Sequence, residues 1–494
     1  MSTYTGPIEN IVVLMLENRS FDNVLGALYP NSPNFEGLTF KEVNYTVGSQ
    51  PVPYTIQNNP NSTAVPPIDP GEAFMDMNLQ IYGNTGGSGS EAMSGFVMDY
   101  LATSQEFPDI VTSATNVCYP ALPRMDNSIN PPAAANGQDM MNYFTTAGTS
   151  PQLPVTGALA QAFGVSDSWF GSCPTQTFAN RLFLHCGTSG GYVDDCEYAE
   201  NLQIFLKFSS VFELLDNKYG VNNSTPNWKV YFHDYSIAWM IDYVWQAFNA
   251  SPNVNVCNFD NCDLGNSSFT PTFLDDVANN TLPRYSFIEP RYGHLTLQTP
   301  NSNHPPFDMI DGEALLATIY NALRNSSYWE KLLFIVIYDE HGGCYDHVAP
   351  PTNATAPGSS APTLPNPTYT FPGTRFGPRV PALIISPYVP AKSIFRPPNF
   401  TPGVNSTGMP FDHTSVIATL NEVFGIGTLW DRANAAPGLA SLLTYSSTNN
   451  GPQTVPVPVP TCNTPSAGPA NMVDVIYKHL LPLISKLDWL KGKL

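Results

Sequence analysis

The chain has 494 residues, 42% of them hydrophobic and 12% charged, so it is long enough and apolar enough to form a large folded core. Its 40 acidic and 20 basic side chains give a formal net charge of −20. This charge argues against nucleic acid as a partner, and phosphate chemistry on such a protein needs concentrated local positive charge, such as a metal ion.

The N-terminal segment contains an apolar run, residues 10–16, which predicts a buried strand. No basic start or long apolar run typical of a secretory signal precedes it, and no window approaches a transmembrane segment. Close cysteine pairs, such as Cys186 with Cys196 and Cys257 with Cys262, and several N-x-S/T sequons favour an oxidising compartment. The two signals disagree, so the sequence leaves both a secreted and a cytoplasmic location open.

Three apolar runs along the chain are each followed by a polar loop, at residues 10–16, 332–338 and 380–386. Between them lie segments with helical spacing of apolar residues, such as residues 311–326, whose first turn is acidic. Buried strands that alternate with amphipathic helices predict an α/β fold with a mostly parallel central sheet flanked by helices on both faces. Ligands of such sheets bind beyond the carboxyl ends of the strands.

The composition divides the chain into three parts. Residues 1–450 are predicted to form one large domain, with loop-like insertions at residues 40–75 and 350–375. Residues 451–469 are Pro-rich and predict an extended linker. Residues 470–494 predict an amphipathic helix with lysines on its polar face, which either packs on the large domain or lies on a membrane surface.

Acidic and amide side chains follow two of the predicted strands. Glu17 and Asn18 come directly after the first strand, and Asp339 and Glu340 come after residues 332–338. Like charges at a half-buried strand end are unfavourable unless a cation or a proton compensates them. Oxygen ligands suit Ca²⁺, Mg²⁺ or Mn²⁺, and nearby imidazoles also admit Zn²⁺, so we expect one or two divalent ions here. The alternative is that arginines or helix N-termini neutralise these acids.

A hydroxyl side chain, Thr177, lies in the segment "WFGSCPTQTFANRLFLH". The apolar spacing after it predicts a helix that begins near Thr177 and places Arg181 one turn further on. Backbone N–H groups at the helix start, the guanidinium and a metal would together hold a phosphoryl group and lower the pKa of the hydroxyl. The alternative is that Thr177 only caps the helix.

Histidines in Asp-containing polar segments form a further set of candidates. An imidazole oriented by a carboxylate can ligate a metal, donate to a phosphate oxygen or protonate a leaving group. Each of them can also be an ordinary buried histidine. The set is His233, His304, His347 and His413.

Five motifs occur in a characteristic order, namely "ENRSFDNVLG", "TFANR" after "SDSWFGS", "DEHGGCYDHVAPP", "GPRVPALIISP" and "DHTSV". From about Ile8 to Phe424 the chain therefore resembles the phosphoesterase family of non-specific phospholipases C and related bacterial acid phosphatases, within the alkaline phosphatase superfamily. The resemblance implies an alkaline-phosphatase-like α/β fold, with the metal and the nucleophile at the carboxyl edge of the sheet.

The resemblance also implies roles for individual residues. Thr177 would attack phosphorus, with His304 and His233 as the other catalytic residues. Asn180, Arg181 and His413 would bind substrate, and His413 is also a candidate ligand of a second metal. The implied metal ligands are Glu17, Asn18, Asp339, Glu340 and Thr177.

Two positions depart from the pattern of the family. The family motif T-x-P-N-R has Ala179 in place of its proline here, which loosens the turn but keeps the hydroxyl, the amide and the guanidinium. Glu72 stands where many relatives carry the histidine of a D-P-x-H segment. A carboxylate at this position either binds metal, accepts a hydrogen bond or changes the preferred substrate.

The expected function is metal-dependent hydrolysis of phospholipids to diacylglycerol and a phosphorylated head group, through a phosphothreonine intermediate. An acid phosphatase that acts on phosphate monoesters is the close alternative. A catalytically silent binding protein on the same scaffold is an alternative of another class. The expected partners are a phospholipid or a small phosphate ester, with peripheral membrane contact through residues 470–494, no transmembrane segment and no nucleic acid.

Overall fold

The computed structural model describes residues 4–459 apart from 47–48, 85, 104–135, 196–205, 223, 252–253, 260–270, 293–298, 366, 368, 370, 404–407 and 446–447. The predicted helix at residues 470–494 and part of the linker lie outside the described residues. Residues 451–459 contain no helix or strand and run along one helix of the core, since Val455 and Asn321 are hydrogen-bonded to each other.

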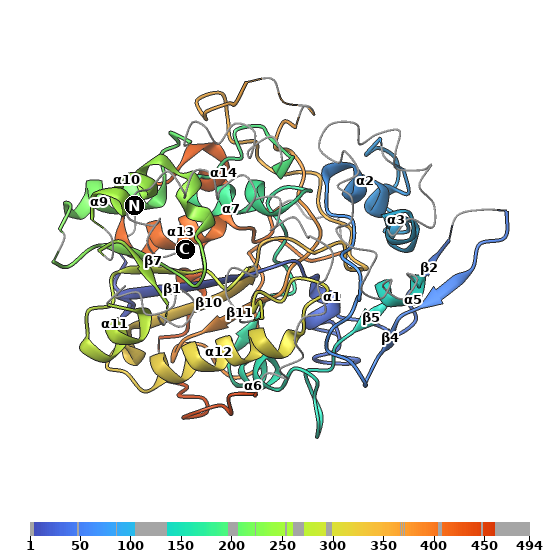
Figure 1. The fold of residues 1–494 in the computed structure, drawn as a ribbon, viewed down its shortest axis with the longest axis horizontal. Helices are drawn as coiled ribbons and strands as arrows, with labels where there is room; N and C mark the ends of the chain where they lie inside the picture. Colours follow the sequence, from blue (N-terminus) through green and yellow to red (C-terminus); the bar gives the residue numbers. More distant parts are fainter. Residues whose placement is uncertain are drawn as a thin grey trace, which may run out of the picture.

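An eight-stranded sheet forms the centre of the protein (Figure 1). Seven strands run in one direction and β11 runs against them. The prediction of a mostly parallel central sheet is therefore confirmed. In spatial order the strands are β12 (Ser393–Ile394), β6 (Gly164–Val165), β11 (Ala382–Ile385), β10 (Leu332–Tyr338), β1 (Asn10–Leu16), β9 (Tyr285–Ile288), β7 (Trp228–Phe232) and β8 (Val256–Asn258).

Helices cover both faces of the sheet, as predicted, because the central strands are apolar on both sides. In Figure 1 one layer lies above the sheet and consists of α7 (Thr177–Cys186), α9 (Val211–Tyr219), α10 (Asp242–Ala250), α13 (Thr414–Phe424) and α14 (Trp430–Ala435). The other layer lies below it and consists of α6 (Pro154–Ala162), α11 (Phe273–Asn279) and α12 (Met309–Arg324).

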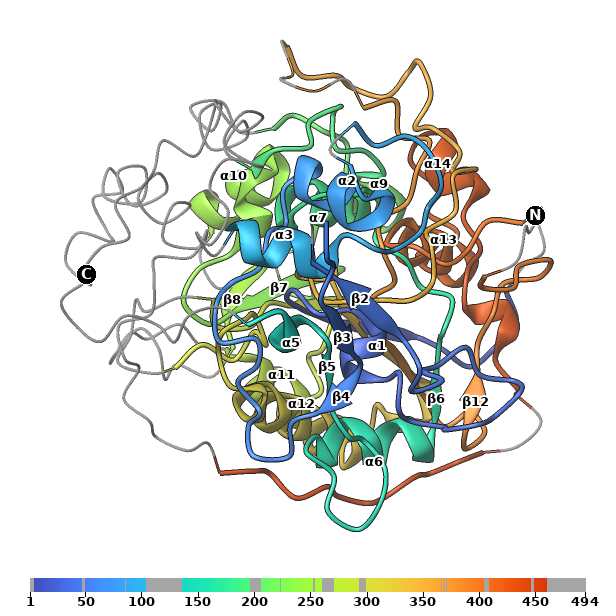
Figure 2. The same cartoon turned by 90° about the vertical axis from the view of Figure 1, so that its right-hand side faces the viewer.

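A group of short elements lies in front of the sheet in the view of Figure 2, on the side where β1 ends and α1 (Phe21–Val24) begins. It has its own apolar cluster, which includes Phe96, Tyr100 and Met141. We refer to residues 40–103 and 137–143 of this group as the cover. Its elements are β2 (Val43–Tyr45), β3 (Pro53–Thr55), β4 (Gln57–Asn58), α2 (Phe74–Tyr82), α3 (Phe96–Thr103), α5 (Gly137–Met140) and β5 (Asn142–Tyr143).

Three expectations from the sequence differ from the structure. Residues 40–75 are not only loop, because they form β2, β3 and β4 within the cover. The helix expected at residues 311–326 is α12, which begins earlier, at Met309, because the side chain of Asp308 accepts a hydrogen bond from Ile310 N at 3.0 Å and caps it. The close spacing of Cys186 and Cys196 would suit a disulfide, but Cys186 is a buried free thiol.

Candidate active site

The carboxyl edge of the sheet carries a row of acidic residues. The neighbouring parallel strands β10, β1, β9 and β7 each lead into a buried carboxylate within two residues of the strand end. Parallel strands end at the same edge, so their four acids are gathered on one side of the sheet. The acids are Asp339 after β10, Glu17 after β1, Glu289 after β9 and Asp234 after β7.

The loops after β1 and β10 are joined directly. Leu16 pairs with Tyr338 at the ends of the two strands, and the backbone N–H of Asn18 donates to Oδ1 of Asp339 at 3.2 Å. Gly342 lies so close that a Cβ there would be 1.9 Å from the carbonyl oxygen of Asn18. Gly342 has φ +64°, and both conditions require glycine at this position.

Helix α7 begins with Thr177, and Arg181, one turn later in this helix, reaches the same edge of the sheet. The guanidinium of Arg181 donates to Oδ2 of Asp339 at 3.1 Å, and its Nη2 lies 3.8 Å from Oε1 of Glu17. The ring of Tyr292 supports the guanidinium from another side, at 5.1 Å. Arg181 is therefore a buried cation among the acids.

Burial raises the pKa of Glu17 well above its ordinary value, and Asp339 raises it further, while Arg181 lowers it. Burial also raises the pKa of Glu340, again with a contribution from Asp339. For Asp339 itself, burial raises the pKa and Arg181 lowers it. One arginine does not compensate three buried carboxylates, which is the situation that a divalent cation relieves.

Three oxygens of these loops have no hydrogen-bond partner in the described part of the protein. They are Oε2 of Glu17, Oδ1 of Asn18 and Oε1 of Glu340, and all three side chains are at most 1% exposed. Buried oxygens in proteins are almost always satisfied by a protein group, a water molecule or an ion, so the unpartnered ones at this sheet edge are open to water or to a cation. Two carboxylates and an amide oxygen form a donor set that suits a hard divalent cation.

Two other groups bring three acid or histidine ligand atoms within 4.8 Å of one another. One contains Asp22, Asp346 and His347, and the other contains Asp69, Glu72 and His304. Within the part of the chain that the structure describes, Glu17, Asp339 and Glu340 do not form such a group by themselves. The case for a cation at the predicted position therefore depends on the unpartnered oxygens and not on the spacing of the acids.

Asn180, one of the predicted substrate-binding residues, uses its amide within the loop before α7. Its Oδ1 accepts from the N–H of Cys173 at 3.0 Å, and its Nδ2 donates to the carbonyls of Cys173, Thr175 and Gln176 at 2.7–3.1 Å. Asn180 therefore shapes the turn that presents Thr177.

The three predicted active-site histidines lie near this edge. Nε2 of His413 donates to the carbonyl of Asp339 at 2.6 Å, while its Nδ1 accepts from the indole of Trp169 at 3.3 Å. Nδ1 of His233, directly after β7, donates to the carbonyl of Glu289 at 3.0 Å. Burial lowers the pKa values of His413 and His304 to about 4, so both rings are neutral near pH 7.

Comparison with known protein families shows to which family this chain belongs. The sequence matches the Phosphoesterase family over residues 8–427. The chain belongs to the Phosphoesterase family. It is accordingly a hydrolase that acts on phosphoric ester bonds.

Curated members similar to this phosphoesterase are phospholipases. Non-specific phospholipase C3 of Arabidopsis thaliana is 31% identical over 85% of this chain and 70% of its own length. Non-specific phospholipase C1 of the same plant is 30% identical over 85% and 68% of the two chains. Phospholipase C B of Mycobacterium tuberculosis is 28% identical over 85% and 74%.

Solved structures give a weaker likeness to this phosphoesterase. A protein in the alkaline phosphatase superfamily from Vibrio parahaemolyticus aligns with 58% of this chain and 63% of its own, at 13% identity and a TM-score of 0.32. The lipoteichoic acid synthase LtaP from Listeria monocytogenes aligns with 60% and 70%, at 13% identity and a TM-score of 0.31. At these scores the alignments identify no site residue.

The sequence analysis missed several groups at the acidic edge, namely the buried Glu289 and Arg19 and the partly exposed Asp69. Glu289 follows the apolar segment "YSFI", so the pattern of a strand followed by an acid was present but short. Asp69 belongs to the cover and does not directly follow a strand, so no local sequence pattern indicated it as a site residue. Arg19 was also missed, and its Nε donates to the carbonyl of Asn303 at 2.7 Å beside His304.

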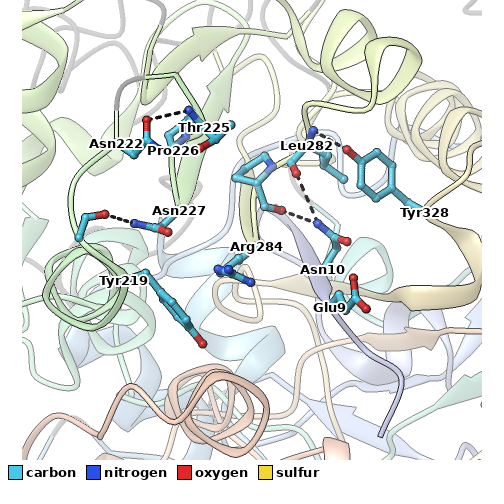
Figure 3. Close-up of a pocket in the computed structure, with 12 residues that line it drawn as sticks. Glu9, Asn10, Tyr219, Asn222, Thr225, Pro226, Asn227, Leu282, Arg284 and Tyr328 are labelled. Atoms are coloured by element: carbon cyan, nitrogen blue, oxygen red, sulfur yellow. Dashed lines mark hydrogen bonds between the residues drawn. The ribbon is translucent and has the colours of Figure 1, made fainter.

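A cavity of about 420 Å³ opens at the opposite edge of the sheet, where β1, β9 and β7 begin. Figure 3 shows Arg284 in this cavity between Tyr219 and Asn10, and its guanidinium lies 4.2 Å from the centre of the Tyr219 ring. The cavity is thus separated from the acidic loops by the length of the strands.

No helix in the described part of the chain is long and apolar enough to cross a lipid bilayer.

Proposed function

We propose that this phosphoesterase is a metal-dependent phospholipase C, which hydrolyses phospholipids to diacylglycerol and a phosphorylated head group. The main support for a metal ion is the set of buried oxygens without partners on Glu17, Asn18 and Glu340. Beside them lies helix α7, which begins with Thr177. The phospholipid substrate is supported by the names of the similar proteins, which are phospholipases C.

In this proposal Glu17, Asn18, Asp339 and Glu340 would hold one divalent cation, with Thr177 as the remaining protein ligand. When bound, the cation supplies positive charge that lowers the pKa of the threonine hydroxyl and offsets the charge of the phosphate. Arg181 donates N–H groups to the phosphate oxygens, for which a guanidinium has the right shape. Its Nη1 has no hydrogen-bond partner in the described structure, whereas Nη2 forms ion pairs with Asp339 at 3.1 Å and Glu17 at 3.8 Å.

The reaction has two displacements at phosphorus. The oxygen of Thr177 attacks phosphorus while its proton passes to solvent, the bond from phosphorus to the glycerol oxygen breaks, and that oxygen takes up the proton of a histidine. Water then attacks phosphorus and gives a proton back to the histidine, while the bond from phosphorus to the threonine oxygen breaks. The threonine oxygen takes a proton from solvent, and the phosphorylated head group is released. We assign the proton donor to His233, directly after β7, because both ring nitrogens of His304 are already used, Nδ1 on the carbonyl of Pro305 and Nε2 on the amide of Asn18.

Thr177→Ala tests the nucleophile. We expect turnover to fall by about 10⁴-fold or more, because the attacking oxygen is lost, whereas Thr177→Ser retains a hydroxyl and a measurable rate. Rapid acid quenching followed by peptide mass spectrometry should find a phosphorylated Thr177 only in the active protein. Near wild-type turnover of Thr177→Ala would show that another group attacks phosphorus.

The close alternative, an acid phosphatase, is distinguished by substrate. Hydrolysis of phosphatidylcholine and p-nitrophenyl phosphocholine, with slow turnover of p-nitrophenyl phosphate, supports the phospholipase. The reverse order supports the phosphatase. Absence of turnover on every ester would instead indicate a binding protein on this scaffold.

A further inference from the structure

Two contacts and an unusual dihedral angle constrain the backbone of Asn18. Its N–H donates to Asp339 and its carbonyl is pressed against Gly342. Its φ of +55° lies in the left-handed region, which asparagine tolerates better than most residues. The side chain therefore leaves the backbone in a defined direction, and only the rotation of its amide group is left to be determined.

The amide of Asn18 uses both of its N–H bonds on two acceptors. Nδ2 lies 2.5 Å from Oε1 of Glu72 and 2.8 Å from Nε2 of His304. His304 must accept at Nε2, because its Nδ1 donates to the carbonyl of Pro305 at 2.6 Å. The remaining polar atom of the amide, Oδ1, has no partner and is fully buried.

The opposite orientation of the Asn18 amide is unfavourable for its contacts with both Glu72 and His304. Turning the group by a half rotation would place Oδ1 against the carboxylate of Glu72 and against the lone pair of His304. Two acceptor–acceptor contacts would replace two hydrogen bonds, in a buried setting where each lost bond is costly. The two acceptors therefore determine which atom of Asn18 faces the acidic loops.

We infer that Glu72 and His304 are positioning residues, which hold the amide of Asn18 so that its Oδ1 is presented to the cation. The inference depends on the proposed cation and concerns the orientation of one of its ligands. It also explains how a carboxylate functions at the position of the D-P-x-H histidine, since Glu72 needs only to accept a hydrogen bond. Partners of this kind typically change metal affinity by about 10- to 100-fold.

The test compares two substitutions that both remove the charge of Glu72. Glu72→Gln keeps an oxygen that accepts from Asn18, whereas Glu72→Met has a similar length and no strong acceptor. Binding of Mn²⁺ to protein stripped with a chelator is measured by titration calorimetry and by the electron paramagnetic resonance of the bound ion. We expect Glu72→Met to bind Mn²⁺ at least about tenfold more weakly than Glu72→Gln.

A second pair of variants shows whether the effect passes through Asn18. In an Asn18→Gly background the amide is absent and φ of +55° is easily adopted, so Glu72→Met and Glu72→Gln should then bind Mn²⁺ equally. A tenfold difference that persists in this background would overturn the inference, because Glu72 would then act directly on the ion.

Asp216 supplies a matched control at the other edge of the sheet. Its carboxylate accepts from the amide of Asn227 at 2.9 Å and is also buried. Asp216→Asn and Asp216→Met should differ in thermal stability but not in Mn²⁺ affinity. A general loss of folding would instead lower both thermal stability and Mn²⁺ affinity, in the Glu72 variants and in the Asp216 variants alike.

The outcomes separate this inference from the proposed function. If wild-type protein binds Mn²⁺ and Glu72→Met binds it as tightly as Glu72→Gln, the inference is wrong and the proposed metal stands. If wild-type protein binds no divalent cation and turnover survives chelation, both are wrong. If Glu72→Met does not fold, the same comparison is made between Glu72→Gln and Glu72→Ala, and equal affinities again overturn the inference.

Discussion

Two clusters of charged side chains arise from the same two loops, after β1 and after β10, and they differ in how their charge is compensated. The first contains Asp22, Asp346 and His347 around the guanidinium of Arg379. The second is the predicted metal site. Each cluster takes acidic residues from both loops, so their difference is not one of position in the fold.

The first cluster is internally neutral. Arg379 contacts Asp22 at 3.0 Å and Asp346 at 2.9 Å, and His347 contacts Asp22 at 2.7 Å. Burial lowers the pKa of His347, but Asp22 and Glu36 outweigh this effect and raise it to about 10, so the ring is charged at pH 7. Two cations thus compensate two buried carboxylates, and neither carboxylate has an unsatisfied oxygen in the described structure.

The second cluster has one arginine for three carboxylates, and Glu17 and Glu340 each keep an unpartnered oxygen. The protein is therefore able to neutralise buried acids with its own side chains, and it does so within the same loops. Close spacing of ligand atoms alone is misleading, because the neutral cluster also has three such atoms within 4.8 Å of one another. The two clusters therefore differ in their oxygens, because the second keeps unpartnered carboxylate oxygens and the first keeps none in the described structure.

The largest expected effect concerns activity. Glu340→Gln removes one charge from the predicted metal site, and we expect turnover to fall by about a thousandfold, since the cation contributes several kcal/mol to the transition state. Asp346→Asn changes an acid of the neutral cluster in the same loop and should retain turnover within a few-fold. Steady-state kinetics on a soluble phosphate ester measures both, and equal losses would abolish the distinction between the clusters.

The next effect concerns stability. Arg379→Met leaves two buried carboxylates without their cation, and breaking such a pair typically costs about 3–5 kcal/mol of unfolding free energy. Lys331→Met, which removes an exposed ion pair with Glu9, should cost less than about 1 kcal/mol. Urea unfolding of both variants measures the difference. Similar small losses would mean that the first cluster is not structural.

Cation binding should stabilise the protein through the second cluster only. At a free Mn²⁺ concentration of one hundred times Kd, a single site contributes about 2.7 kcal/mol to the free energy of unfolding. We expect this gain in stripped wild-type protein and in Arg379→Met, and a smaller gain in Glu340→Gln at the same Mn²⁺ concentration. Thermal unfolding with and without Mn²⁺ gives the measurement. A full gain in Glu340→Gln would place the ion elsewhere.

The smallest effect is a dependence of stability on pH. The pKa of His347 rises from 6.5 to about 10 on folding, so its contribution is complete below pH 6.5 and is lost as the pH rises through 10. We expect wild-type protein to lose about 2 kcal/mol more than His347→Gln over this interval, since partial exposure of the ring weakens the effect. Parallel unfolding curves at each pH would contradict a charged His347.

The sequence predicted the central strands and the start of α7 because these depend on local patterns. Seven consecutive buried residues mark both β1 and β10, and the helical spacing after Thr177 marks α7. The placement of Glu17 and Asp339 at one edge follows from the parallel pairing of their strands. The strands and the helix needed no information about distant parts of the chain, whereas the pairing of β1 with β10 joins two distant segments.

The partners of the predicted residues were not accessible in this way. Glu72 reaches Asn18 only because the cover folds over the sheet edge, 54 residues further along the chain. Arg379 lies 357 residues from Asp22, and nothing near His347 in the sequence shows that its cluster is already neutral. The roles of individual residues at the site remain predictions, which the proposed variants test.

The contact between Gly342 and the carbonyl of Asn18 has a mechanical consequence. With no side chain between them, the two acid-bearing loops are expected to move as one rigid piece, anchored to adjacent strands. Room for a phospholipid, the proposed substrate, would then come from the segments in front of them, residues 40–103 above all. Sequence changes in residues 40–103 would then alter which esters enter the site without moving the reacting groups.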